Sequence, residues 1–152
     1  MLNRLNIKVC GMREAANIKA LLDQNIDYVG LIFYPKSPRF VAQVPVILFP
    51  ERVKKIGVFV NVSVEEMKQK IKDFSLDGVQ LHGQESVQTC QEIKKIGCLV
   101  FKVFHVDNDF DFQLTQAYAP VCDYFLFDTK GKKLGGNGIR FDWQKLNEYK
   151  KK

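Results

Sequence analysis

The sequence IKVCGMR at residues 7–13 runs an apolar strand into one reactive side chain, the thiol of Cys10. Far along the chain, FLFDTK at residues 125–130 does the same with the carboxylate of Asp128. In barrels of alternating strands and helices, the carboxyl ends of the strands carry the catalytic groups at one mouth. The two segments therefore predict a parallel α/β enzyme in which Cys10 and Asp128 carry out proton transfer.

Between these two segments, the chain alternates strand-like and helix-like runs. The strand-like runs are rich in Val, Ile, Leu and Phe without strict alternation, which is typical of strands buried on both faces. They cover residues 7–10, 28–33, 55–60, 78–81, 99–104 and 124–127. Helical patterns cover residues 14–24, 64–74, 86–96, 112–118 and 143–149. Ser63 and Asp142 are candidate helix caps, and the proline-rich stretch 34–52 is expected to be a long loop.

Strict alternation of strand and helix without internal repeats means parallel strands joined by right-handed crossovers. Two architectures satisfy it, a doubly wound open sheet and a closed barrel, and composition does not choose between them. A nucleotide-binding open sheet would carry G-x-G-x-x-G or G-x-x-x-x-G-K-[ST] after an early strand. Neither motif occurs in the turns after the first strands, so a dinucleotide-binding domain is disfavoured.

Composition describes one globular domain over residues 1–152, with 46% hydrophobic and 26% charged residues. The net charge of +6 comes from lysines spread along the helical stretches, so we expect no nucleic-acid partner. The amino terminus lacks an apolar signal core, and no apolar run approaches the length of a membrane span. We therefore expect a cytoplasmic protein without membrane contact.

The four cysteines show no C-x-x-C pair and no histidine at ligand spacing. Neither a zinc site nor a disulfide framework is therefore indicated, and we expect no metal. Cys90, Cys98 and Cys122 are expected to be small buried apolar side chains. Considered without other information, Cys10 would also be a buried structural cysteine, and Asp128 would be a helix or turn cap.

A set of motifs that occur in a fixed order along the chain favours catalytic roles for Cys10 and Asp128 instead. The motifs are KVCGM at 8–12, GLIFYPKSPR at 30–39, GVFVN at 57–61, VQLHG at 79–83, LFDT at 126–129, GGNG at 135–138 and FDW at 141–143. With this ordered set, the chain resembles the phosphoribosylanthranilate isomerases of tryptophan biosynthesis. The resemblance extends over almost the whole chain, from Ile7 to Leu146.

The resemblance implies a TIM (β/α)8-barrel that converts N-(5-phosphoribosyl)anthranilate to 1-(2-carboxyphenylamino)-1-deoxyribulose 5-phosphate, an Amadori rearrangement without metal or organic cofactor. The reaction donates a proton to the ribose ring oxygen and removes one from C2 of the sugar, so one acid and one base suffice. By motif match, Asp128 is the implied acid and Cys10 the implied base. A free thiol titrates near ~8.5 and a free aspartate near ~3.9, so both roles require surroundings that shift the pKa.

Arg39 and His82 are the implied substrate-binding residues. Arg39 closes the segment Pro35–Arg39, whose two prolines limit backbone freedom. The resemblance places its guanidinium against the anthranilate carboxylate, a bidentate geometry that lysine cannot copy. His82 follows the strand-like run 78–81 and is expected to contact substrate or to steady the pocket by a hydrogen bond. His105 follows the next run in the same way, and a structural role is expected for it.

Gly135, Gly136 and Gly138 predict a mobile cover over the barrel mouth. Glycines also let backbone amides approach an anion closely, so a phosphate cradle is the alternative. In phosphate-binding barrels, however, the phosphate site usually lies in the loops after strands 7 and 8, and this loop follows the sixth strand.

The chain departs from the family in length, because it holds only the first six β/α units. We expect either a truncated product or a part of a longer protein, and no measurable isomerisation by residues 1–152 alone. The alternative is a catalytically inactive fragment that persists by associating with a partner chain, since two open apolar edges invite pairing. Another phosphate-binding barrel is disfavoured, because it would leave Arg39 without a carboxylate partner.

Overall fold

The structure is a computed structural model that describes residues 4–43, 46–131 and 142–149. Six strands form one parallel sheet in which each strand pairs with the next along the chain. They are β1 (Lys8–Cys10), β2 (Tyr28–Ile32), β3 (Lys54–Phe59), β4 (Gly78–Leu81), β5 (Leu99–Val106) and β6 (Tyr124–Thr129). The helices are α1 (Ala15–Leu22), α2 (Val64–Phe74), α3 (Val87–Lys95) and the 3-10 helices η1 (Phe112–Tyr118) and η2 (Trp143–Glu148). The chain is thus a partial β/α barrel, as its sequence predicts.

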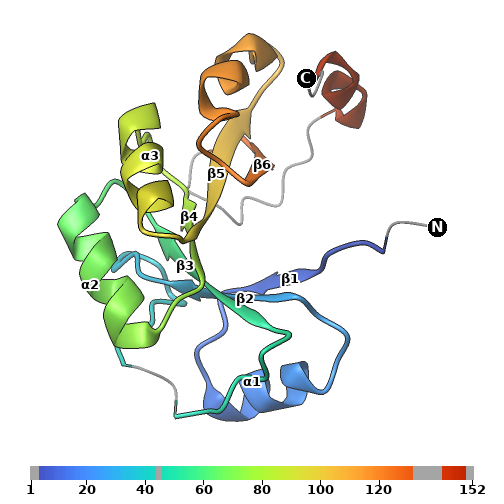
Figure 1. Ribbon diagram of the computed structural model, residues 1–152. Coiled ribbons are helices and arrows are strands. Elements are labelled where there is room, and N and C mark those ends of the chain that lie inside the picture. The colour runs from blue at the N-terminus through green and yellow to red at the C-terminus, as the bar shows by residue number, and fades with distance from the viewer. Residues whose placement is uncertain (1–3, 44–45, 132–141, 150–152) are drawn as a thin grey trace.

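The helices α1, α2 and α3 lie outside the curved sheet (Figure 1). The core lies between the sheet and these helices, and its fully buried members include Ile18, Val29, Met67, Val79 and Ile93. Each such side chain contributes roughly 1.5–3 kcal/mol by leaving water. The outer face of the sheet is therefore occupied by packing, which leaves the concave face for a site.

The expected capping of α2 is confirmed. Ser63 Oγ accepts a hydrogen bond from Glu66 N at 3.1 Å, which satisfies one of the unpaired N–H groups of the first turn. Asp142 likewise caps η2 by accepting from Gln144 N at 2.9 Å. The boundaries of α2 are those that the sequence pattern predicts.

Three aspartates repeat one arrangement at the amino ends of the strands. Asp27, Asp77 and Asp123 each precede an even-numbered strand and accept, at 2.8 Å, the backbone N–H of a residue at the start of the preceding strand. The three donors are Ile7, Lys55 and Val100. The backbone N–H of each aspartate bonds to the carbonyl of the same residue. These two hydrogen bonds per aspartate fix the register of the strand pairs. We call this region the amino edge.

An aromatic cluster closes the concave face near the amino edge. The hydroxyl groups of Tyr28 on β2 and Tyr124 on β6 lie 3.0 Å apart, and the rings of Phe101 and Tyr124 stack at 4.6 Å. Since β2 and β6 are far apart in the order of strands, their contact requires the sheet to curl as a barrel wall. Burial, with the hydrogen bond from Tyr124, raises the pKa of Tyr28 to about 12. We call Tyr28, Phe101 and Tyr124 the aromatic floor.

The structure differs from the sequence prediction in two elements. The helical patterns at 112–118 and 143–149 form 3-10 helices and not α-helices, in keeping with their shortness and their aspartate caps. Strand β5 runs to Val106, so His105 lies within the strand and not after it. The stretch 34–52 has no helix in its described parts, 34–43 and 46–52, which confirms the expected loop. None of the helices of the described ranges is long and apolar enough to cross a membrane.

Candidate active site

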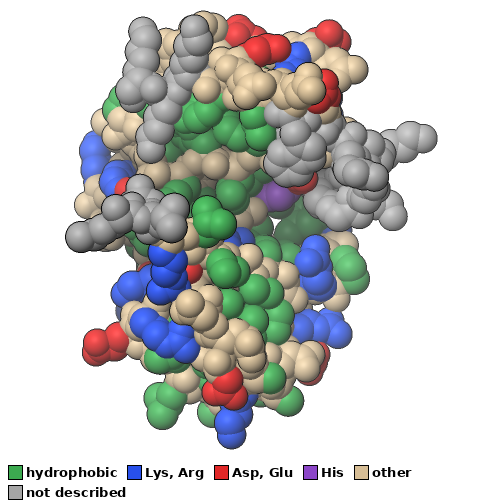
Figure 2. All heavy atoms as spheres, turned by 90° about the vertical axis from the view of Figure 1, so that its right-hand side faces the viewer, with side chains coloured by type: hydrophobic (Ala, Val, Ile, Leu, Met, Phe, Trp, Pro, Cys, Tyr) green, Lys and Arg blue, Asp and Glu red, His purple; other side chains and the backbone are tan. Residues whose placement is uncertain are grey.

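The chemistry-bearing side chains lie on the concave face, toward the carboxyl ends of the strands. Successive side chains of a strand point to opposite faces, so Asp128 shares the face of Tyr124, roughly 13 Å further along β6 at ~3.3 Å per residue. His105 is the register partner of Asp128, so it projects from the same face. Cys10 also projects from it, because it lies two residues after Lys8, the register partner of Tyr28. In Figure 2, histidine and acidic surface is recessed in the middle of the view, with hydrophobic surface above and below it. We call this region the carboxyl edge.

Arg39 lies beside Cys10. Its Nη1 donates to the Cys10 carbonyl at 3.4 Å, and its own backbone N–H donates to Ser37 Oγ at 3.2 Å. Gly11 has φ +85°, and a Cβ at this position would lie 2.6 Å from Arg39 Nη1. Glycine is therefore required here both by the backbone and by the close approach of the guanidinium. Because Arg39 is exposed, its other N–H groups are available to a carboxylate.

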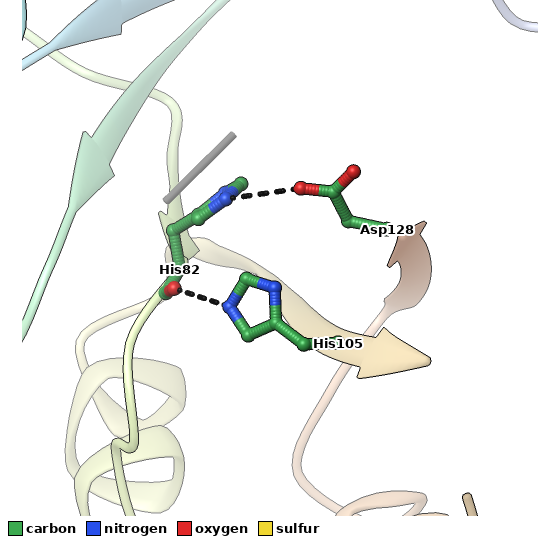
Figure 3. A group of neighbouring side chains, drawn as sticks. All are labelled: His82, His105 and Asp128. Carbon is green, nitrogen blue, oxygen red and sulfur yellow. Dashed lines mark hydrogen bonds and ion pairs between the residues drawn. The ribbon is translucent and has the colours of Figure 1, made fainter. Parts of the chain in front are cut away.

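His82 and Asp128 form the second pair. His82 follows β4, and its Nε2 lies 3.5 Å from Oδ2 of Asp128 (Figure 3). This separation is longer than a hydrogen bond, and His82 Nε2 is buried without a hydrogen-bond partner in the described residues. Burial, and then the charge of His105, lower the pKa of His82. His82 is therefore neutral at pH 7.

Two neighbouring side chains orient His82. The amide Nε2 of Gln80 donates to His82 Nδ1 at 2.8 Å, so neutral His82 carries its proton on Nε2, the atom that faces Asp128. His105 Nε2 donates to the His82 carbonyl at 3.1 Å (Figure 3). His105 is also the register partner of Asp128. Strand pairing thus brings His105 next to Asp128, and its contact with the His82 carbonyl fits the expected structural role.

His82, His105 and Asp128 are also the described residues that could hold a metal ion. One donor atom from each lies within 4.8 Å of the other two. Two histidines and a carboxylate are a donor set for divalent transition metals. Ligation through His82 Nε2 would require a free lone pair, whereas the Gln80 amide leaves a proton on that atom. The arrangement suits proton transfer better than metal binding.

A buried ion pair supports the loop that carries His82. Lys102 Nζ lies 3.0 Å from Glu85 Oε2, and the two side chains are only 4% and 3% exposed. Lys102 Nζ also donates to the Gly83 carbonyl at 2.7 Å, and Gly83 N donates to Glu85 Oε2 at 3.0 Å. Sequence reasoning did not find this pair. The signal that was present is a lysine in the apolar run 99–104, where a buried charge needs a partner.

The structure thus brings the predicted site residues together in two pairs, Arg39 with Cys10 and His82 with Asp128. Among the described residues, no contact joins the two pairs, since β1 and β6 are the end strands of the sheet. Gly135, Gly136 and Gly138 lie outside the described residues, and the cover loop stays a prediction.

Comparison with known proteins identifies the family of this chain. The family model "N-(5'phosphoribosyl)anthranilate (PRA) isomerase" matches residues 7–152. The N-(5'-phosphoribosyl)anthranilate isomerase of Phocaeicola vulgatus is 45% identical over 146 residues, 96% of this chain and 71% of that protein. The isomerase of Parabacteroides distasonis is 44% identical over 149 residues, 95% of this chain and 67% of that protein.

Solved structures give the same result. Phosphoribosyl anthranilate isomerase from Thermotoga maritima has a TM-score of 0.84 at 32% identity, over 96% of this chain and 72% of that one. A phosphoribosyl anthranilate isomerase in complex with reduced 1-(o-carboxyphenylamino)-1-deoxyribulose 5-phosphate has a TM-score of 0.67 at 28% identity, over 82% and 75%. The chain therefore belongs to the N-(5'-phosphoribosyl)anthranilate isomerase family.

Proposed function

We propose that this chain is an isomerase of tryptophan biosynthesis that converts N-(5'-phosphoribosyl)anthranilate to 1-(2-carboxyphenylamino)-1-deoxyribulose 5-phosphate, with Cys10 as base and Asp128 as acid. The observation that supports the roles is the pairing at the carboxyl edge, where the guanidinium of Arg39 contacts the backbone carbonyl of Cys10 and the carboxylate of Asp128 lies beside the imidazole of His82. A related isomerase binds a reduced form of this product.

Asp128 acts first, as a general acid. Its proton passes to the ring oxygen of the ribose, the bond from C1 to that oxygen breaks, and the nitrogen lone pair forms an iminium with C1. The step requires the protonated carboxyl group. Asp128 is half-buried beside His82 at the carboxyl edge, which supports this placement of the acid.

Cys10 acts second, as a general base. The thiolate takes the proton from C2, and the electrons of that bond form a double bond between C1 and C2 as the iminium nitrogen becomes neutral. The resulting enolamine tautomerises to the ketone. No electrons leave the substrate, so neither step requires a redox cofactor.

Arg39 binds the anthranilate carboxylate. A guanidinium donates two parallel N–H bonds to a carboxylate, which fixes both the position and the orientation of the aromatic ring. The backbone around Gly11 lets this guanidinium lie next to the residue proposed as base. The substrate carboxylate at Arg39 would therefore hold the sugar close to Cys10.

The isomerase is favoured over the alternative of a catalytically inactive fragment held by a partner chain. The family match begins at residue 7 and reaches residue 152, and both proposed reacting groups lie inside it. Arg39 and His82, the two proposed substrate contacts, also lie inside it.

The proposal is tested by Cys10→Ser and Asp128→Asn in the full-length protein. Each variant is expected to lower kcat by roughly 10²- to 10⁴-fold, the range of general acid–base catalysis. The matched controls are Cys122→Ser and Asp23→Asn, which change the same groups away from the carboxyl edge and should stay within about threefold of the parent, far below that range. Near-normal rates in either test variant would refute the role of that residue.

A further inference from the structure

Lys8 and Cys10 share one small space on the concave face. They are two residues apart on β1, so their side chains project from the same face. Cys10 is the register partner of Gly30 on β2. A Cβ on Gly30 would lie 2.7 Å from Cys10 Sγ and 3.0 Å from Lys8 Nζ. The absent side chain of Gly30 therefore leaves the room in which the thiol and the ammonium meet.

The ammonium of Lys8 has no anionic partner in residues 4–43, 46–131 and 142–149. Its Nζ takes part in none of the ion pairs or hydrogen bonds of these residues, although the side chain is half-buried. A partly desolvated cation is stabilised when a neighbouring group becomes an anion. The thiol of Cys10 is an ionisable group that shares the space in front of Gly30 with this ammonium.

The other charges around Cys10 point in the same direction. The guanidinium of Arg39 approaches from the loop after β2 and contacts the Cys10 carbonyl. On β2, Tyr28 is held neutral by its raised pKa, and the nearest carboxylate along that strand, Asp27, is engaged by Arg4 and by Ile7 N. Two cations thus lie near the thiol, and Lys8 is the one on its own face of the strand.

We propose that Lys8 is a positioning residue that holds Cys10 as a thiolate and so makes it competent as the base. The inference rests on the proposed function, in which Cys10 accepts the C2 proton. A thiol with its ordinary pKa is mostly protonated at pH 7, and an opposite charge at ~4–6 Å favours the ionised form. Lys8 stays protonated throughout, so the proton moves only from C2 to sulfur.

The test measures the thiol itself. The rate of alkylation of Cys10 by iodoacetamide is followed between pH 5.5 and 10 by mass spectrometry of the Cys10 peptide, in this chain and in Lys8→Met. The midpoint of Lys8→Met is expected to lie about one pH unit higher, which makes alkylation at pH 7 about tenfold slower. Lys8→Gln is the second neutral variant, in case Lys8→Met does not fold.

Two controls isolate the charge at this position. Lys8→Arg keeps the cation, and its midpoint is expected within about 0.3 unit of the parent, since a cation at the same place favours the thiolate equally. Lys19→Met removes an exposed lysine from α1 and should leave the midpoint unchanged. A midpoint in folded Lys8→Met or Lys8→Gln that equals the parent value would overturn the inference.

Failure of this inference and failure of the proposed function are distinguishable. If Cys10→Ser keeps full activity, Cys10 is not the base. If Cys10→Ser is inactive but neutral variants of Lys8 leave the alkylation midpoint unchanged, only the role of Lys8 is wrong. In the full-length protein, Lys8→Met should lower kcat more at pH 6.5 than at pH 9 with KM unchanged, a split that a structural role would not produce.

Discussion

The amino and carboxyl ends of the strands differ in how completely their polar groups are hydrogen-bonded. At the amino edge, three aspartates each accept a backbone N–H at 2.8 Å, and the hydroxyl groups of the aromatic floor meet at 3.0 Å. At the carboxyl edge, the contact of Arg39 with the Cys10 carbonyl is 3.4 Å, that of His82 with Asp128 is 3.5 Å, and His82 Nε2 has no partner.

This difference indicates that the polar groups of the amino edge stabilise the fold, whereas those of the carboxyl edge are available for catalysis. Polar groups with short, complete hydrogen bonds contribute to the free energy of unfolding, whereas groups with long or missing partners remain available to a substrate. Barrel enzymes in general keep stability at the amino-terminal face and catalysis at the carboxyl-terminal face. Near the carboxyl edge, the buried ion pair Lys102–Glu85 lies behind the site, and a second pair, Lys130–Asp107, joins the exposed segments that follow β6 and β5 at 2.6 Å.

Lys102→Met should produce the largest loss of stability. The substitution leaves Glu85 charged and buried without its partner, so the free energy of unfolding is expected to fall by about 3–5 kcal/mol in urea denaturation. The control, Lys54→Met, removes the half-exposed partner of Asp77 and should cost less than about 1 kcal/mol. Equal losses in the two variants would show that burial of the pair is not what matters.

Arg39→Met should affect binding and not folding. The lost bidentate bonds to a substrate carboxylate are worth about 1.5–3 kcal/mol, so KM is expected to rise about 10- to 100-fold with little change in kcat. The free energy of unfolding should change by less than about 0.5 kcal/mol, because the residue is exposed. Steady-state kinetics of the full-length protein provides the measurement. An unchanged KM would remove Arg39 from the substrate site.

Asp77→Ala should show the reverse behaviour at the amino edge. It removes the acceptor of the Lys55 N–H and should lower the free energy of unfolding by about 1.5 kcal/mol. Because Asp77 lies at the far end of the strands from the site, kcat/KM should stay within about twofold, or about 0.4 kcal/mol. A large loss of activity at unchanged stability would contradict the division between the two edges.

Tyr28→Phe should give the smallest effect, about 1 kcal/mol at pH 8, from the lost hydroxyl contact with Tyr124. The raised pKa of Tyr28, about 12 against roughly 10 in the unfolded chain, adds a pH dependence. The folded state keeps the proton more tightly, so this stabilisation is complete below pH 10 and is lost as the pH rises toward 12. The fall in urea midpoint between pH 10 and 11.5 should therefore be shallower in Tyr28→Phe, and an identical fall would contradict the assignment.

Local pattern predicted the strands, the caps and the two ends of the site. Apolar runs located all six strands, and Ser63 located the start of α2. Position at strand ends singled out Cys10 and Asp128, and the family resemblance favoured a catalytic role for them. Such features depend only on neighbours in sequence, and for this reason a single sequence reveals them.

Contacts between strands could not be predicted in the same way. The approach of His105 to Asp128 depends on the register of β5 with β6. The space shared by Lys8 and Cys10 depends on the register of β1 with β2, which places Gly30 opposite Cys10. The pairing of Lys102 with Glu85 depends on how the loop after β4 folds back. Neither register nor loop path is encoded in the periodicity of one segment.

The most direct test of the division between the edges is the free energy of unfolding of Asp128→Asn, measured by urea denaturation of this chain. If Asp128 is held for chemistry, the isosteric change leaves the free energy of unfolding within about 0.5 kcal/mol of the parent, or raises it. A fall of about 2 kcal/mol or more would make Asp128 a structural group and would contradict the account.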